Sequence, residues 1–309
     1  MLLSAEECRK KPTAIFIISY NRGEYLKRVI SSYKKQDRPV DIIIHDNGSD
    51  DLNTRKALAD AEKKGIKVYY KEKIHCADEL NNVSETIHDY FRDWSEPQEY
   101  IVTDCDIDLS MTDKNAINIY SALLNKFNNV DCVGPMLTIA DIPHTYPLRN
   151  KALNRHIMQF WHKKPLKLEY DGREIFYIFA PIDTTFAIYR AGSEYRRLKS
   201  GLRLYNPFEA KHLDWHEVQK NDSYSQSSNS KISHWSNEQF KKENKNEKLH
   251  YSSFYIIQQN AVKKVKLQPG ASFWRIMHRY FTGAASLFYI TFRRYFARTV
   301  KPFFNLRKI

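Results

Sequence analysis

The sequence predicts an α/β fold, in which a doubly wound, mostly parallel sheet is flanked by helices. Through the first 130 residues, short apolar runs rich in β-branched side chains alternate with segments of helical periodicity. Polar clusters directly follow three of these apolar runs. In a parallel sheet the loops at the carboxyl ends of the strands form the binding site. We therefore expect the functional residues at that edge.

The expected elements alternate in order along the chain. We predict strands at 14–19, 40–45, 66–70 and 100–103, and helices at 24–35, 52–64, 80–94 and 115–127. Gly65 ends the second helix, because glycine favours the position just after a helix. A short strand is expected at 130–133. Beyond Pro135 the pattern becomes irregular. The runs 175–180 and 184–189 are expected to pair with each other around Asp183, and residues 216–248 to form a mobile surface loop.

Charge separates the chain into a nearly neutral body, expected as a domain over residues 1–260, and a basic tail at 261–309. The net charge is +13, and residues 261–309 carry eleven Lys and Arg, which leaves 13 − 11 = +2 for residues 1–260. On a helix, Arg275, Arg279 and Arg293 would share one narrow stripe among aromatic and aliphatic side chains. A basic amphipathic helix of this kind is typical of an anionic membrane surface. The alternative is a helix packed on the domain or on a dimer partner, and no nucleic-acid motif accompanies the charge.

Cysteine usage and the N-terminal residues bear on location. The four cysteines are widely spaced, with no Cys-x-x-Cys, which is typical of a reducing compartment and disfavours structural zinc. No secretory signal is visible at the N-terminus, and no apolar run has the length of a spanning helix. We expect a cytoplasmic protein, peripheral on the inner face of a membrane.

The stretch Tyr100 to Leu109 carries aspartate at every second position, as Asp104, Asp106 and Asp108. On an extended backbone alternate side chains share a face, so these carboxylates would gather at the end of a buried strand. Like charges that close repel unless a positive charge lies between them. Mg²⁺ or Mn²⁺ would serve, because both prefer carboxylate oxygens. A solvated acidic turn is the alternative.

Three motifs in this order resemble GT-A fold glycosyltransferases, especially family 2: Ser19-Tyr-Asn-Arg22, Asp46-Asn-Gly-Ser-Asp-Asp51 and Thr103-Asp-Cys-Asp106. The resemblance covers residues 13–110 well and 180–235 loosely. It implies a GT-A-like sheet in which 13–110 bind the nucleotide and 111–260 the acceptor. The nucleotide contacts would be Ser19, Tyr20, Asn21, Arg22, Asp46, Asn47 and Asp104. Asp104 and Asp106 would bind Mn²⁺ or Mg²⁺.

The resemblance also implies a carboxylate base and a late metal-binding histidine. Asp214 is the first candidate for the base and Asp183 the second, with contact to acceptor hydroxyls as another role for Asp183. A helix N-cap is the alternative for Asp214. His234 is the candidate metal ligand and His212 its alternative, unless either is simply a surface histidine.

Together these features predict a metal-dependent enzyme that moves a sugar from a nucleotide-sugar to a hydroxyl of a glycan or glycolipid. We expect a UDP-sugar donor, an inverting reaction and a role in surface polysaccharide or glycoconjugate synthesis. One alternative is a nucleotidyltransferase that makes the activated sugar, although its usual Gly-rich loop after the first strand is reduced here to Gly23. Another is a non-catalytic protein that binds a membrane surface.

Overall fold

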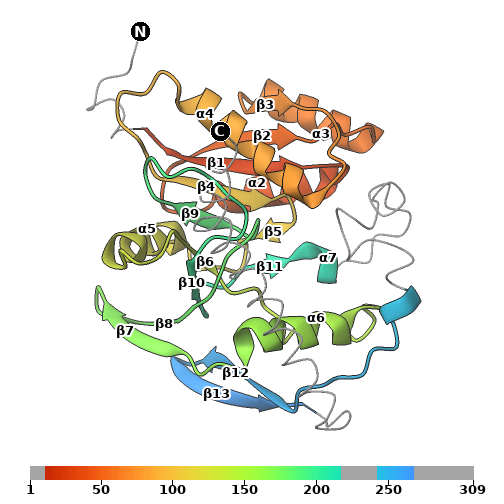
Figure 1. The fold of residues 1–309 in the computed structure, drawn as a ribbon, viewed down its shortest axis with the longest axis vertical. Coiled ribbons are helices and arrows are strands. Elements are labelled where there is room, and N and C mark those ends of the chain that lie inside the picture. The colour runs from red at the N-terminus through yellow and green to blue at the C-terminus, as the bar shows by residue number, and fades with distance from the viewer. Residues whose placement is uncertain (1–10, 217–241, 268–309) are drawn as a thin grey trace, which may run out of the picture.

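The computed structural model describes residues 11–216 and 242–267. Within them, nine strands form one sheet in the order β3-β2-β1-β4-β9-β6-β10-β8-β7 (Figure 1). The strands are β1 (Thr13–Ser19), β2 (Val40–Asp46), β3 (Lys67–Tyr70), β4 (Tyr100–Asp104), β6 (Cys132–Pro135), β7 (Leu166–Tyr170), β8 (Arg173–Phe179), β9 (Ala187–Tyr189) and β10 (Gly201–Leu204). The helices are α2 (Gly23–Tyr33), α3 (Leu52–Lys63), α4 (Val83–Phe91) after the 3-10 turn η1 (Ala77–Asn82), α5 (Ala116–Lys126), α6 (Arg149–His156), which continues into the π-turn η2 (Ile157–Trp161), and α7 (Leu213–His216).

The predicted α/β fold is confirmed. Strands β3, β2, β1 and β4 pair in parallel, as do β6 and β10. Strands β7, β8 and β9 pair antiparallel with their neighbours, so the sheet is mixed in its second half. Every residue of β1 is buried, because helices cover both faces of the sheet at this strand.

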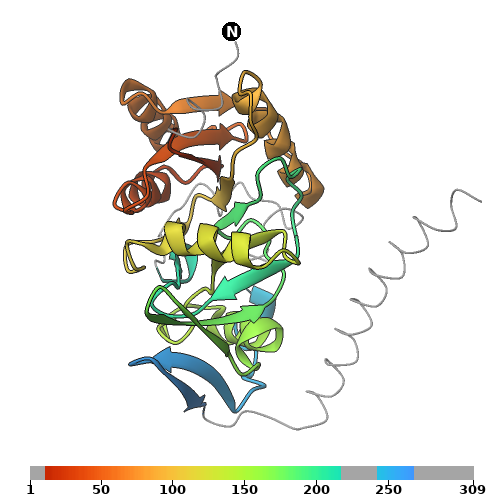
Figure 2. The same cartoon turned by 90° about the vertical axis from the view of Figure 1, so that its left-hand side faces the viewer.

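The apolar core lies on both faces of the sheet. Ile15 and Ile17 of β1 belong to the larger cluster, which also contains residues of α2, α3 and α5. Phe16 and Ile18 belong to the smaller cluster, which is closed by Val83 and Ile87 of α4. Successive residues of a strand point to opposite faces, so one continuous apolar run supplies both layers. Figure 2 shows α4 on the opposite side of the sheet from α2 and α3.

The prediction that 175–180 and 184–189 pair with each other is wrong. β8 lies between β7 and β10, whereas β9 lies between β4 and β6. Each of the two runs does contain a strand. An apolar run indicates a buried strand, but it does not select the neighbouring strand.

Two smaller sheets complete the described part of the chain. β5 (Ile107–Asp108) pairs with β11 (Lys211–His212), which places the strand before α7 beside the end of the aspartate run. β12 (Ser253–Gln258) and β13 (Ala261–Lys266) form a hairpin, and Phe254 packs its ring on Trp161. The expected boundary after residue 260 falls in the turn of this hairpin, so residues 261–266 continue the folded part. The rest of the expected tail, from 268 on, lies outside the described residues, as do 217–241 of the expected mobile loop.

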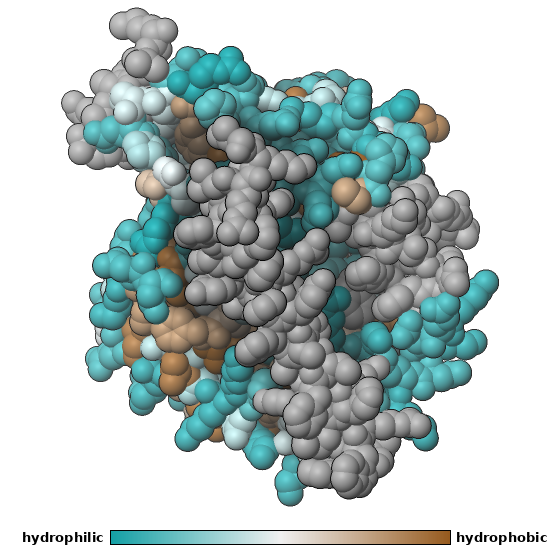
Figure 3. All heavy atoms as spheres, in the orientation of Figure 1, coloured by the Kyte–Doolittle hydropathy of each residue, from teal (hydrophilic) through white to brown (hydrophobic). Residues whose placement is uncertain are grey.

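The surface view adds two observations. The face in Figure 3 is mostly hydrophilic, with apolar side chains gathered at its lower left, the side on which β7 and β8 lie in Figure 1. Leu166 of β7 and Phe179 of β8 are among the exposed large apolar residues. Among residues 11–216 and 242–267, no helix is both long and apolar enough to cross a bilayer.

Candidate functional site

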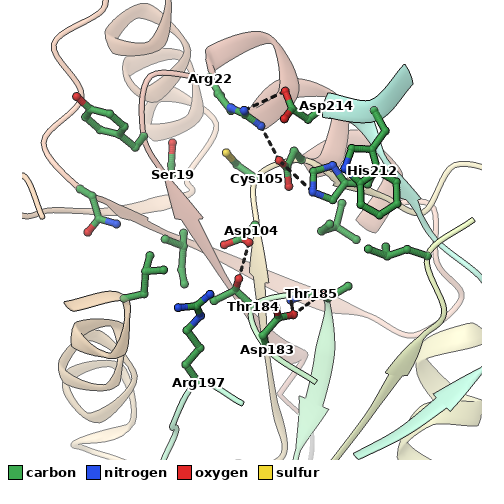
Figure 4. Close-up of a pocket in the computed structure, with 18 of the residues that line it drawn as sticks. Ser19, Arg22, Asp104, Cys105, Asp183, Thr184, Thr185, Arg197, His212 and Asp214 are labelled. Atoms are coloured by element: carbon green, nitrogen blue, oxygen red, sulfur yellow. Dashed lines mark hydrogen bonds and ion pairs between the residues drawn. The ribbon is translucent and has the colours of Figure 1, made fainter. Parts of the chain in front are cut away.

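A pocket of about 240 Å³ opens where β1 and β4 end, between the parallel half of the sheet and the segments that carry α6 and α7. Its lining is rich in charge of both signs. The acidic residues are Asp104, Asp106, Asp183 and Asp214, and the basic ones are Arg22, Lys73, Arg155, Arg197 and Arg203, with His156 and His212 beside them. Figure 4 labels several of these residues, and it shows that Arg22, Asp104 and Asp214 converge from segments that are far apart in the sequence.

Arg22 lies at the centre of the acidic group. Its Nη1 donates to Asp106 Oδ2 at 2.5 Å, and its Nη2 donates to Asp214 Oδ1 at 3.0 Å. The Arg22 side chain is only 4 % exposed. A guanidinium can serve two carboxylates at once because its donors point outward in a rigid fork. Arg22 therefore joins the end of the aspartate run to α7 (Figure 4).

Asp104 ends β4 and is held by the segment that precedes β9. Its Oδ2 accepts a hydrogen bond from Thr184 Oγ1 at 2.5 Å, and its backbone N–H donates to the Thr184 carbonyl at 2.8 Å. Burial raises the pKa of Asp104 well above its ordinary value, the negative charge of Asp106 raises it further, and the Thr184 bond acts in the opposite direction. The carboxylates of Asp104 and Asp106 thus resist sharing the pocket without added positive charge.

The third aspartate of the run, Asp108, lies apart from the pocket. Residues 105 and 106 form a turn between β4 and β5, which breaks the strict alternation expected from the sequence. Asp108 instead pairs with Arg28 at 3.3 Å and accepts from the Ser110 hydroxyl at 2.7 Å. The expectation that all three carboxylates gather on one face is therefore wrong for Asp108.

Asp183 has a different environment from the other acidic residues. Its Oδ1 accepts from Thr185 Oγ1 at 2.6 Å, and Arg203 Nη2 lies 3.9 Å away. Burial by itself raises the pKa of Asp183, but the Arg203 charge and the Thr185 bond outweigh it and lower the pKa to about 2. Arg203 is itself fixed, because it donates to the carbonyls of Pro181 and Pro135. Asp183 is thus a stable anion that accepts hydrogen bonds.

Aromatic rings line the wall beside α7. The His212 ring stacks on Trp215 with centroids 4.4 Å apart and planes 2° from parallel. His156, at the end of α6, meets the same Trp215 ring edge-on at 4.6 Å. Burial lowers the pKa of His156 well below its ordinary value, and the charges of Arg155 and Arg203 act in the same direction. His156 is therefore a neutral imidazole at the pocket wall.

The loops after β1 and β2 are bound to each other. Asn21, at φ 48°, accepts from the backbone N–H groups of Asp50 and Asp51 and donates to the Asp50 carboxylate. Both oxygens of Asp46 accept from Ser49, once from its hydroxyl at 2.6 Å and once from its N–H at 2.9 Å. Gly48 has φ 73°, and a Cβ there would lie 2.9 Å from the backbone N of Lys73. These contacts shape the loop that borders the pocket.

The sequence-predicted site residues are thus placed as follows. Those that line the pocket are Ser19, Tyr20, Arg22, Asn47, Asp104, Asp106, Asp183, His212 and Asp214. Asn21 and Asp46 are buried in the loop contacts just described and do not line it. His234 lies outside the described residues. Their roles stay predictions.

Several lining residues were missed from the sequence. Lys73 follows β3, so its place after a parallel strand was a usable signal. Arg203 lies inside β10, and Arg155 and His156 end α6. Nothing in their local sequence distinguishes them from ordinary strand or helix residues.

The carboxylates of Asp104 and Asp106 supply some of the ligands that a hard divalent cation requires. Asp104 and Asp106 offer carboxylate oxygens, and Asp106 Oδ1 is buried without a hydrogen-bond partner. Of the two candidate histidines, His212 is brought beside this carboxylate, with Nε2 3.8 Å from Asp106 Oδ2. Within residues 11–216 and 242–267, no group of three or more His, Cys, Asp and Glu is placed to hold a metal ion. Further ligands would have to come from substrate phosphates and water.

Comparison with known proteins gives one family match, which covers the first half of the sheet. Residues 14–104, from β1 to the end of β4, match the family model described as glycosyl transferase family 2. This part of the chain is therefore similar to family 2 glycosyltransferases. A search against curated protein sequences gives no match.

Two solved structures are similar to parts of this chain at low sequence identity. S. aureus TarS 1-349 in complex with UDP-GlcNAc is 12% identical to this chain, with a TM-score of 0.42. The match covers 71% of this chain and 62% of the TarS chain. The mannosyltransferase PcManGT from Pyrobaculum calidifontis, in complex with GDP-Man and Mn²⁺, is 14% identical, covers 45% of this chain and 41% of its own, and has a TM-score of 0.33. In both cases less than two thirds of the other chain is covered.

Proposed function

We propose that this glycosyltransferase moves a sugar from a nucleotide-sugar, with a UDP-sugar as first choice, to a hydroxyl of a glycan or glycolipid. One observation carries the proposal: four aspartates from three separate segments, Asp104, Asp106, Asp183 and Asp214, line one pocket where β1 and β4 of the family-matched region end. Sugar transfer needs charge compensation for a leaving diphosphate and a base for the attacking hydroxyl. Two pairs of carboxylates in one pocket supply candidates for both.

The nucleotide side of the pocket is the part bordered by β1 and β2. Ser19, Tyr20 and Asn47 line it, and the Lys73 ammonium lies 5.2 Å from the centroid of the Tyr20 ring. We propose that these residues bind the nucleoside diphosphate. A divalent cation held by Asp104 and Asp106 would neutralise charge on the leaving diphosphate.

Of the two candidate bases, we propose Asp214. A general base works best when its pKa lies near the working pH, and the lowered pKa of Asp183, about 2, makes that carboxylate a poor proton acceptor. We propose that Asp183 accepts hydrogen bonds from substrate hydroxyls. Asp214 takes the proton of the acceptor hydroxyl. At the same time the hydroxyl oxygen forms a bond to the anomeric carbon of the donor sugar, and the bond from that carbon to the diphosphate breaks. Attack opposite the leaving group inverts the anomeric centre.

The membrane association expected from the sequence is part of the same proposal. The charge of residues 261–309, with eleven Lys and Arg and no Asp or Glu, supports binding to an anionic membrane surface. A lipid-linked acceptor would present its hydroxyl at that surface. We propose a cytoplasmic enzyme, peripheral on the inner face of a membrane, that acts in surface polysaccharide or glycoconjugate synthesis.

The test incubates the protein with a panel of UDP-sugars, with and without acceptor, and measures the release of UDP. We expect UDP release with Mn²⁺ or Mg²⁺, its loss with EDTA, and its loss in Asp106→Asn. Asp108→Asn is the matched control, because Asp108 belongs to the same aspartate run but lies outside the pocket. Release that ignores EDTA, or equal losses in both variants, would refute the assignment of the metal carboxylates.

A further inference from the structure

The Arg22 guanidinium connects two carboxylates that the proposed function gives different tasks. It contacts Asp106 at 2.5 Å and Asp214 at 3.0 Å, across 84 and 192 positions of sequence. The three side chains are 4 %, 10 % and 15 % exposed, so water screens the group little. Arg22 follows β1, Asp106 follows β4 and Asp214 lies in α7. The contact therefore exists only in the folded chain.

Arg22 contacts only one of the two oxygens of Asp106. Within the described residues, the second oxygen, Oδ1, is buried and has no hydrogen-bond partner. A buried carboxylate oxygen is costly unless it is paired. Oδ1 is thus an acceptor that a cation could contact on the side of Asp106 that Arg22 does not occupy.

A divalent cation at Asp106 changes the balance around Arg22. The cation and the Arg22 guanidinium would then be two positive charges that compete for one carboxylate. Repulsion between charges this close is strong in a buried site. Arg22 also contacts Asp214, at 3.0 Å, so the guanidinium can strengthen that interaction without leaving the pocket.

We propose that Arg22 is a positioning residue that partly fills the cation site of the donor-free enzyme and shifts toward Asp214 when a divalent cation binds. This inference rests on the proposed function, in which Asp106 binds the cation and Asp214 acts as base. Arg22 then lowers the affinity of the empty enzyme for free metal ions. When the cation is in place, Arg22 leaves Asp106 and holds Asp214 in position.

The experiment measures binding of Mn²⁺ alone to the full chain by electron paramagnetic resonance, in the wild type, Arg22→Met and Arg22→Lys. We expect Arg22→Met to bind Mn²⁺ about tenfold more tightly without donor, because the competing charge is gone. Arg22→Lys keeps the charge and should bind Mn²⁺ as the wild type does. With saturating Mn²⁺ and UDP-sugar, Arg22→Met should lose most of its kcat while KM for the donor changes little, and Arg22→Lys should recover part of that kcat.

Arg28→Met is the matched control. Arg28 lies on the same helix α2 and pairs with Asp108 of the same run, at 3.3 Å, but outside the pocket. This variant should leave both Mn²⁺ affinity and kcat unchanged. Thermal unfolding shows whether each variant is folded. If Arg22→Met is not folded, Arg22→Gln is used in its place.

If the folded neutral variant, Arg22→Met or Arg22→Gln, binds Mn²⁺ no more tightly than the wild type, the inference is overturned, because Arg22 then does not compete with the cation. That result leaves the proposed function standing if the wild type still hydrolyses UDP-sugars with Mn²⁺. A wild type that neither binds Mn²⁺ nor hydrolyses any UDP-sugar overturns both.

Discussion

Replacing Asp106 by alanine tests whether the Arg22 contact exists in solution. From the sequence alone, removal of one of several crowded carboxylates is expected to relieve repulsion and leave the fold intact or slightly more stable. In the structure Asp106 is also a partner of a guanidinium that is only 4 % exposed. Removal of the Asp106 carboxylate therefore leaves the buried Arg22 guanidinium with one fewer carboxylate partner.

The size of the effect follows from what remains. Breaking a buried ion pair by removing one partner costs about 3–5 kcal/mol when the other charge is left alone. Here Asp214 still contacts Arg22 at 3.0 Å, and repulsion between Asp106 and Asp104 disappears. The backbone bond from Leu213 N–H to the Asp106 carbonyl survives the substitution. We therefore expect Asp106→Ala to lower the free energy of unfolding by about 1–3 kcal/mol.

Urea unfolding at pH 7 and low salt measures this difference. Asp60→Ala is the control, because Asp60 forms only a surface pair with Lys63 on α3, at 3.6 Å, and should change stability by less than about 0.5 kcal/mol. Asp106→Ala should also lose Mn²⁺-dependent UDP release. If Asp106→Ala is as stable as the wild type or more stable, repulsion dominates this site and the buried pair does not form in solution.

Three further predictions concern the base, an unusual glutamate and the tail. Asp214→Asn should lower turnover by about 10²–10⁴-fold with little change in donor KM, because Asn cannot accept the proton; an active Asp214→Asn beside an inactive Asp183→Asn would make Asp183 the base. Burial raises the pKa of Glu209 from an ordinary 4.5 to about 7, so the folded chain holds a proton that the unfolded chain has lost, and stability falls as pH rises from about 4.5 through 7. Glu209→Gln can still accept the bond that Asn206 N–H donates at 2.9 Å, so it should match the wild type near pH 4.5 and be more stable by about 3 kcal/mol at pH 8. A stability difference that does not vary with pH in thermal melts would contradict this. A chain that ends at Gln268 should stay folded and hydrolyse donor but no longer bind vesicles of acidic lipids, which the full chain should bind more weakly as salt rises; if the full chain ignores such vesicles, the tail has another role.

The sequence by itself determined the parallel half of the fold and the edge at which the pocket lies. The predicted strands at 14–19, 40–45 and 100–103 differ from β1, β2 and β4 by at most one residue at either end. Continuous apolar runs make these strands recognisable, because a strand buried on both faces contains few polar residues. Residues that follow parallel strands meet at one edge of the sheet, and Ser19, Asn47 and Asp106 all line the pocket at that edge.

Only the tertiary structure decided which residues meet across the pocket. A local pattern records periodicity and burial, but it does not identify the neighbour of a strand, so the separation of β8 from β9 was not visible. The turn at residues 105 and 106 separated Asp108 from Asp106 for the same reason, since spacing fixes a shared face only while the strand continues. Arg22 was expected to bind a nucleotide because of its motif. Its contacts with Asp106 and Asp214 arise because a buried charge requires a partner, and chain folding supplied one 192 residues away.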